Sequence, residues 1–192
     1  ALSLGKRLGQ LARYLQPRRV GIARDNLHKT FPDMPANEMA RTIDAMFRHL
    51  GANFVDMLRI DLFRGQKDIE RFFTFHNGER LTEALALGRG CILLTGRVGF
   101  WEAGTFFLPL LGFATDVVAK PRRNPWVDRF FTRLREAKGT HVINSHKGAR
   151  GILKALQNHH AVCILLDQNL SHHGSVPAPL FVPPAHTTHI IT

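Results

Sequence analysis

Two residues of opposite charge follow the apolar run CILLT. Arg97 stands two residues after Thr95, and Glu102 follows five residues later. An apolar run of this length predicts a short buried strand, so the polar residues after it emerge where that strand ends. Arg97 is close enough in sequence to pair with Glu102, either as a structural ion pair or as part of a reactive site. Arginine cannot be a general base because its guanidinium stays protonated. Glu102 begins a predicted helix, whose dipole stabilises its negative charge.

The other side chains that could do chemistry give weaker patterns. The chain has 11 histidines, which include the adjacent pairs His159–His160 and His172–His173 and the spaced pair His186 and His189. None of these has the partner spacing of a metal site, so we predict solvated loop histidines and no metal. The sequence has no G-x-S-x-G elbow, no G-x-G-x-x-G after a strand and no Walker loop, which argues against a serine hydrolase and a nucleotide-binding enzyme.

Strands and helices alternate in the second half of the chain. Apolar runs predict strands at residues 91–95, 114–119, 140–144 and 161–166, and helical patterns lie between them at 101–111, 125–138 and 147–157. Such alternation predicts an α/β fold with a largely parallel sheet and helices on both faces. Ligands of such sheets bind beyond the carboxyl ends of the strands. We therefore expect a functional site where residues 95–102 meet Asp167 and Gln168.

The first half of the chain is predicted to be helical. Helices are expected before Pro17, at residues 18–31, over the long apolar-periodic stretch 37–62, and at 78–87, with a short strand at 72–75. The tail, residues 171–192, is rich in Pro and His, has no clear pattern, and ends without a closing element. We predict a helical, membrane-proximal lead-in over residues 1–62 and an α/β domain over residues 63–192 that is incomplete at its carboxyl end.

Composition narrows the class of partner. The formal net charge is +11 over 192 residues, which attracts phosphates, anionic lipids or acidic proteins. The first helix carries Leu4, Leu8, Leu11 and Leu15 among basic residues, a pattern of helices that lie on anionic membranes or pack on their own domain. A prediction of nucleic-acid binding would rest on the positive charge alone, because no known nucleic-acid-binding motif is recognised. Cys91 and Cys163 lie in apolar runs, which indicates buried free thiols and reducing conditions.

Four segments in the same order resemble one known family. These are RRVGIARDNLHKTFPDMP, NGERLTEALALGRGCILLTGRVGFWEAG, AKPRRNPWVDRFFTRLREAKG and VCILLDQNLSHHGSVPAPLF. Together they resemble the late acyltransferases of lipid A biosynthesis, the lauroyl/myristoyl acyltransferase family, which is related to the glycerolipid acyltransferases. The resemblance runs through most of the chain. It implies an enzyme that moves a fatty acyl chain from acyl carrier protein to a hydroxyl of a lipid A-type acceptor.

The resemblance also implies a mechanism and shows a departure from it. In the family a His-x4-Asp/Glu motif supplies a histidine that removes the hydroxyl proton and a carboxylate that orients the imidazole. Glu102 takes the place of that carboxylate, with Trp101 before it. Arg97 stands where the family has histidine, and Phe100 where it has asparagine. Because Arg97 cannot accept the proton, we expect activity to be lower by roughly 10²–10⁴-fold. His76 and His146 are the nearest substitutes, although their spacing does not favour them.

Further expectations follow from the same resemblance. Arg135, Arg122 and Asp167, with Trp101, are candidate substrate-binding residues, and Arg123 beside Arg122 could act in the same way. A surface salt bridge explains each of the charged residues equally well. No cofactor is implied. The implied partners are acyl carrier protein, a lipid acceptor and the anionic membrane surface, with no nucleic acid, at the cytoplasmic face of the bacterial inner membrane. The alternative is a non-catalytic paralogue that binds lipid or acyl carrier on the same fold.

Overall fold

The computed structural model describes residues 2–167, 175–178 and 185–188, and the chain divides into two compact units. One unit contains residues 1–60 and 169–188, and the other contains residues 61–168 and 189–192. The predicted domain boundary at residue 62 stays a prediction. In the described residues, no helix combines the length and the apolar character that a membrane crossing requires.

The described residues of the first unit form three helices and an antiparallel pair of strands. Its elements are α1 (Leu2–Leu15), α2 (Pro17–Thr30), α3 (Ala36–Leu58), β5 (Ser175–Ala178) and β6 (Ala185–Thr188). Pro17 is the first residue of α2. Proline is tolerated there because the N–H groups in the first turn of a helix have no hydrogen-bond partner within the helix. β5 and β6 pair antiparallel, so the prediction of an irregular tail over residues 171–192 is wrong for these two segments. The rest of that tail lies outside the described residues.

Helix α1 packs on α3 through glycine. A Cβ atom added to Gly9 would stand 2.0 Å from the carbonyl oxygen of Phe47, so the two backbones touch where only glycine fits. Gly5 and Gly9 are the buried residues of α1, whereas Leu4, Leu8, Leu11 and Leu15 on the same helix are exposed. The predicted amphipathic helix therefore packs on its own unit through glycines, and its leucines remain on the surface.

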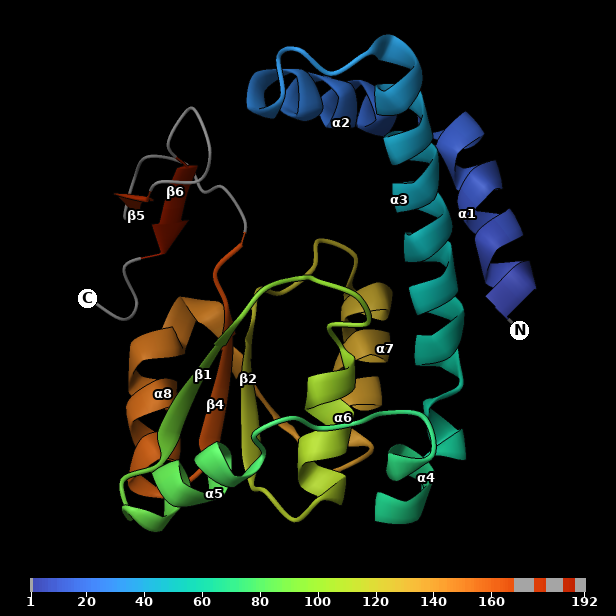
Figure 1. The fold of residues 1–192 in the computed structure, drawn as a ribbon. Helices are drawn as coiled ribbons and strands as arrows, with labels where there is room; N and C mark the ends of the chain where they lie inside the picture. Colours follow the sequence, from blue (N-terminus) through green and yellow to red (C-terminus); the bar gives the residue numbers. More distant parts are fainter. Residues whose placement is uncertain (1, 168–174, 179–184, 189–192) are drawn as a thin grey trace. The chain divides into compact units, whose positions relative to one another are not determined.

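The second unit holds a four-stranded parallel sheet, which confirms the predicted fold class (Figure 1). The strands are β1 (Cys91–Thr95), β2 (Thr115–Ala119), β3 (His141–Asn144) and β4 (Ala161–Leu165), in the order β1-β4-β2-β3. The helices are α4 (Gln66–Glu70), α5 (Glu79–Ala86), α6 (Ala103–Leu110), α7 (Pro125–Glu136) and α8 (Gly148–Gln157), with 3-10 turns η1 (Ile60–Leu62) and η2 (Ser145–Lys147). Helix α4 was not predicted.

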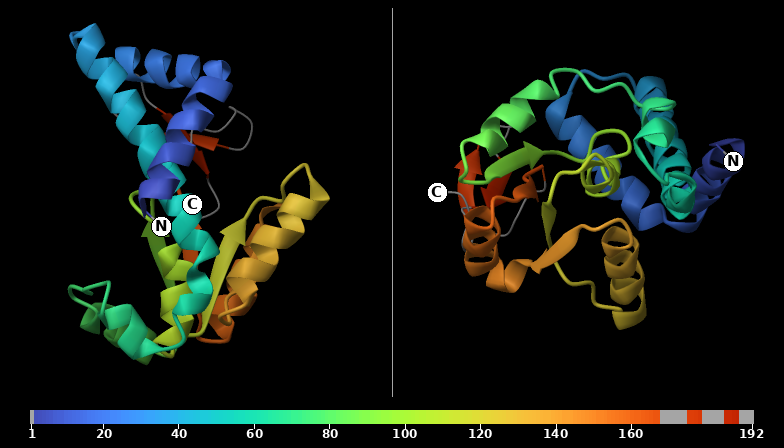
Figure 2. Two further views of the ribbon diagram at one scale, coloured as in Figure 1. Left: turned by 90° about the vertical axis from the view of Figure 1, so that its right-hand side faces the viewer. Right: turned by 90° about the horizontal axis from the view of Figure 1, so that it is seen from below.

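The order of the strands explains why both faces are covered. The connections β1-α6-β2 and β2-α7-β3 move in one direction across the sheet, and β3-α8-β4 returns in the other. Because such crossovers are right-handed, the return places α8 on the face opposite α6 and α7 (Figure 2). Ile152 and Ala155 of α8 pack with Val162 and Ile164 of the central strand β4. The predicted helices on both faces are confirmed.

Phenylalanine packing replaces the strand predicted at residues 72–75. The segment that contains Phe72 and Phe73 has no strand pairing. The Phe73 ring instead lies 4.3 Å from that of Phe107 in α6, and Phe63 lies 5.3 Å from Phe107, centroid to centroid. The prediction is wrong because the aromatic residues of this segment pack as rings against a helix.

Both cysteines are free, as predicted. Cys163 is buried in β4, whereas Cys91 at the start of β1 is only partly buried. Burial raises the pKa of Cys163 to about 12, with further contributions from Cys91 and Asp116 nearby. Partial burial also raises the pKa of Cys91. Both thiols therefore stay protonated and weakly nucleophilic near neutral pH.

Candidate functional site

The candidate site lies at the carboxyl ends of β1 and β4. These strands are neighbours in parallel register, with Thr95 paired to Leu165. The backbone N–H of Leu166 donates to the carbonyl oxygen of Thr95 at 3.2 Å, and this bond holds the segments that follow β1 and β4 together just past the sheet. The residues that follow, Arg97 and Asp167, are brought to the same edge although they lie far apart in sequence.

Arg97 and Asp167 form an ion pair at this edge. The backbone N–H of Arg97 donates to Oδ2 of Asp167 at 2.8 Å, and the Arg97 guanidinium donates to Oδ1 of the same carboxylate. The two side chains are 33% and 35% exposed, so water reaches the pair and weakens its charge attraction. Asp167 thus fixes both the backbone and the side chain of Arg97.

Glu102 forms a second and more deeply buried pair, with Arg135 of α7. Nε of Arg135 donates to Oε2 at 2.9 Å, and Nη2 donates to Oε1 at 2.7 Å. This fork geometry is the strong form of an arginine–carboxylate contact. The Glu102 side chain is only 10% exposed and the Arg135 side chain 13%. Because burial removes most of the water around both charges, each charge needs the other to offset the cost of that lost hydration.

The predicted pairing of Arg97 with Glu102 is therefore wrong. Each residue binds a partner from a distant part of the chain: Arg97 binds Asp167, just past β4, and Glu102 binds Arg135 of α7. The reason is the path of the chain: residues 96–102 leave the strand as turns, and Glu102 is buried at the start of α6 while Arg97 stays exposed at the end of the strand. Closeness in sequence did not predict closeness of the charged groups.

Two threonines support Glu102, and the sequence analysis missed both. The Thr105 hydroxyl donates to the carbonyl oxygen of Glu102 at 2.7 Å, and the Thr140 hydroxyl donates to the carbonyl oxygen of Thr105. Both threonines are buried. The spacing of Thr105, three residues after Glu102 within the predicted helix 101–111, is a signal that could have identified the first contact. Nothing in the sequence points to Thr140.

Arg122 reaches the same region from the end of β2. Its backbone N–H donates to Oδ1 of Asp128 at 2.8 Å, and its guanidinium carbon lies 3.9 Å from the centroid of the Phe131 ring. The guanidinium of Arg135 lies 6.0 Å from the same ring. Phe131 thus connects Arg122 to the pair formed by Arg135 and Glu102. Cation–π contacts of this kind hold an arginine in place without neutralising its charge.

The remaining candidates lie around these pairs. Trp101 is half-buried in the turn before Glu102, and Arg123 is exposed beside Arg122. His76 is exposed between α4 and α5, and His146 is exposed in η2 beyond the edge strand β3. The prediction that Arg135 binds an anionic head group stays a prediction, as does that for Arg122. The contact that the structure shows for Arg135 is its double hydrogen bond to the Glu102 carboxylate.

His160 departs from the expectation of solvated loop histidines. Nδ1 of His160 lies 2.6 Å from Oδ2 of the buried Asp116, and the His160 side chain is 22% exposed. This contact lies at the amino ends of the strands, the edge opposite the two arginine pairs. The prediction of a free loop histidine is wrong here because His160 precedes β4 directly and faces the neighbouring strand.

The carboxyl edge can hold negative charge but lacks a base at position 97. Both carboxylates bind guanidinium groups, which do not release protons near neutral pH. An anionic group near this edge would meet Arg122 and Arg123, which are exposed.

Comparison with known proteins gives a consistent result. The family model described as bacterial lipid A biosynthesis acyltransferase matches residues 1–192. A lipid A biosynthesis palmitoleoyltransferase of Escherichia coli (strain K12) is 29% identical over 180 residues, which cover 93% of this chain and 57% of that protein. A lipid A biosynthesis lauroyltransferase of the same strain is 30% identical over 185 residues, with coverage of 93% and 57%. The chain therefore spans less than two thirds of the length of these relatives.

Proposed function

Because the chain belongs to the bacterial lipid A biosynthesis acyltransferase family, we propose that it transfers a fatty acyl chain to a hydroxyl of a lipid A-type acceptor. The donor in this proposal is the thioester of acyl carrier protein. The observation that carries it is the family match over residues 1–192. We propose that Glu102, buried at the start of α6, takes the place of the motif carboxylate. The fork contact from Arg135 supports this role because it fixes the orientation of the Glu102 carboxylate.

In the proposed reaction a base accepts the acceptor's hydroxyl proton while the oxygen attacks the thioester carbonyl carbon. The thiolate of the carrier then leaves, and the base returns its proton to it. Histidine suits this task because its pKa lies near neutral pH, and arginine does not. With Arg97 in this position, we propose that the chain transfers acyl groups slowly and that Arg97 instead holds a fixed positive charge against Asp167.

The surface of the protein supports the proposed partners. Acyl carrier protein is acidic, and a net charge of +11 favours its encounter with this chain. Exposed basic side chains at the start of α7 include Arg122, Arg123 and Arg129. We propose that this surface receives the carrier.

We also propose attachment at the cytoplasmic face of the inner membrane. The exposed leucines of α1 (44–72% exposed), interleaved with Lys6, Arg7 and Arg13, form an amphipathic surface of the kind that lies on anionic lipid. The exposed apolar side chains of α3, Met46, Leu50, Phe54 and Leu58, follow one another at four-residue steps on that helix. The apolar area that these leucines leave exposed would be removed from water if the helix lay on an apolar phase.

The decisive experiment compares the purified protein with Arg97→His and Arg97→Gln variants. Each is incubated with radiolabelled acyl-carrier-protein thioester and a lipid A precursor, and labelled lipid is quantified. We expect Arg97→His to exceed the natural chain by roughly 10²–10⁴-fold, since it supplies a positioned base. Arg97→Gln removes the charge without adding a base and should give no such gain. An equal gain in both variants would contradict the role assigned to position 97.

The same assay separates the second candidate function. A non-catalytic paralogue is favoured by one observation, the occupation of both edge carboxylates by arginine. If Arg97→His transfers no label while it and the natural chain both bind vesicles containing anionic phospholipid, the protein is a binding paralogue. If neither the natural chain nor Arg97→His binds vesicles or acyl carrier protein, both the acyltransferase proposal and the binding-paralogue proposal are wrong.

A further inference from the structure

The amino edge of the parallel sheet gathers three side chains that bind metals in other proteins. Asp116 is the second residue of β2, His141 is the first residue of β3, and His160 directly precedes β4. Asp116 and His141 are partners in the parallel register, so their side chains leave the same face of the sheet. His160 lies two residues before Val162, which pairs with Asp116 from the other side, so it shares that face as well.

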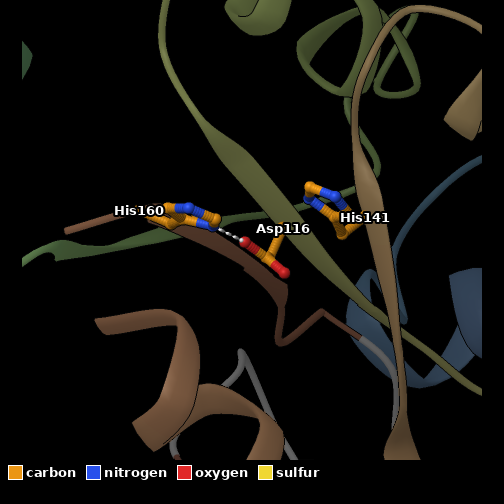
Figure 3. A group of neighbouring side chains, drawn as sticks. All are labelled: Asp116, His141 and His160. Carbon is orange, nitrogen blue, oxygen red and sulfur yellow. Dashed lines mark hydrogen bonds and ion pairs between the residues drawn. The ribbon is translucent and has the colours of Figure 1, made fainter. Parts of the chain in front are cut away.

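These side chains converge on one point. One donor atom from each, two imidazole nitrogens and a carboxylate oxygen, all lie within 4.8 Å of one another. In the view of Figure 3 the Asp116 carboxylate lies between the two imidazole rings. The rings are nearly parallel, at 16° with centroids 5.9 Å apart. Two ligands of a tetrahedral zinc ion stand roughly 3.4 Å apart, since each bond is about 2.1 Å long. The exposed His141 therefore has to turn toward the other two donors, and the 2.6 Å contact between His160 and Asp116 has to widen.

The backbone holds His160 rigidly in this position. Helix α8 ends in a Schellman motif, in which the N–H of His160 donates to the Ala155 carbonyl at 3.0 Å and the N–H of His159 donates to the Leu156 carbonyl at 2.9 Å. The carbonyl of His160 accepts from the N–H of Cys91 at 3.1 Å. Gly90, at φ +65°, packs so closely on the carbonyls of His160 and Leu156 that a Cβ would stand 2.8 Å from each oxygen. The ligand therefore rests on a backbone fixed from both sides.

The burial of Asp116 gives a reason for a cation here. The residue is 6% exposed and sits on a strand with neighbours on both sides. A buried carboxylate is costly unless its charge is compensated. At the carboxyl edge, arginine supplies that compensation, whereas Asp116 faces imidazoles that are not permanently charged. Two neutral imidazoles and one carboxylate are a donor set that suits Zn²⁺ and neighbouring first-row ions.

We propose that Asp116, His141 and His160 bind one divalent first-row metal ion, with Zn²⁺ as the expected species and one coordination position left to water. The ion links the amino ends of β2, β3 and β4. The site is separate from the proposed acyl-transfer site, because strands of five residues put about 15 Å between the two edges of the sheet. It stabilises the sheet and takes no part in acyl transfer.

The first test measures zinc affinity directly. Protein freed of metal with a chelator is titrated with ZnCl₂ in competition with a chromophoric zinc indicator. The natural chain should bind one zinc ion at this cluster with higher affinity than at any of its other histidines. His141→Gln should lower the zinc affinity of the cluster by at least about 100-fold, since loss of even an outer-shell partner costs 10–100-fold. The 11 histidines of the chain make matched controls necessary. His159→Asn and His146→Gln change exposed histidines outside the cluster and should keep the affinity.

Two results would overturn the proposal: His141→Gln binding zinc as tightly as the natural chain, or the His159→Asn control losing the site equally. Folding does not confound the test, because His141 is exposed on the edge strand β3. His160→Gln and Asp116→Asn add support where they fold. Substitution by Co²⁺ gives a second readout, since its visible d–d absorption is strong in tetrahedral sites and should disappear in His141→Gln. A weak octahedral spectrum in the natural chain would contradict the assigned ligand set.

A thermal measurement tests the stabilising role. A ligand that binds only the folded state raises Tm as its concentration rises. Saturating Zn²⁺ should raise the Tm of the natural chain and of His159→Asn but leave His141→Gln unchanged. Equal shifts in all three proteins would show that zinc acts elsewhere and would refute the site.

Discussion

The two edges of the same parallel sheet treat a buried carboxylate in opposite ways. At the carboxyl edge Glu102 is bound by both arms of Arg135, a cation whose charge does not change near neutral pH. At the amino edge Asp116 meets His160, with His141 within reach. An arginine fixes the charge of its site permanently, whereas imidazoles can exchange a proton or bind a metal. The difference indicates that the carboxyl edge fixes the orientation of the Glu102 carboxylate, whereas the amino edge can bind a proton or a metal ion reversibly.

The largest effect should come from breaking the carboxyl-edge pair. Arg135→Met removes the partner of Glu102, whose side chain is 10% exposed, and leaves a buried charge without compensation. We expect the free energy of unfolding to fall by about 3–5 kcal/mol, measured by urea denaturation. Arg133→Met, an exposed arginine of the same helix, is the control and should change it by less than about 0.5 kcal/mol.

A double variant sharpens this result. Glu102→Gln combined with Arg135→Met removes both charges, so it should recover part of the loss seen for Arg135→Met alone. If Arg135→Met costs no more than Arg133→Met, the pair is not the rigid support that the comparison assigns to the carboxyl edge.

A smaller effect, of opposite sign, is expected at the amino edge. His159 occupies the C′ position of the Schellman motif at φ +63°, where glycine is usual and other residues are strained. Substitution His159→Gly should raise the free energy of unfolding by about 0.5–1 kcal/mol, seen as a higher denaturation midpoint at unchanged slope. Gln157→Gly, in the last helical residue of α8, is the opposite control and should destabilise. A loss of stability in both variants would contradict the strain.

The sequence predicted one edge far better than the other. Alternating apolar runs and helical periods identified the sheet, and the turn after CILLT placed Glu102 near the start of a helix. The partners of Glu102 and Arg97 lie 33 and 70 residues away, and no periodicity encodes such distances. The cluster at the amino edge escaped for the same reason. Its residues lie on β2, on β3 and directly before β4, and strand order depends on crossovers that a single sequence does not specify.

The smallest effect concerns the exposed pair at the carboxyl edge itself. Arg97 and Asp167 are about one third exposed, and such pairs contribute roughly 0.2–1 kcal/mol. Arg97→Gln should therefore lower the free energy of unfolding by about 0.5 kcal/mol, and the coupling energy from a double-mutant cycle with Asp167→Asn should stay below about 1 kcal/mol and shrink with added salt. The same cycle on Glu102 and Arg135 should give a larger coupling that salt changes little. If Arg97 and Asp167 couple by more than about 2 kcal/mol, the pair is structural, and Arg97→His would then lose stability while it gains a base.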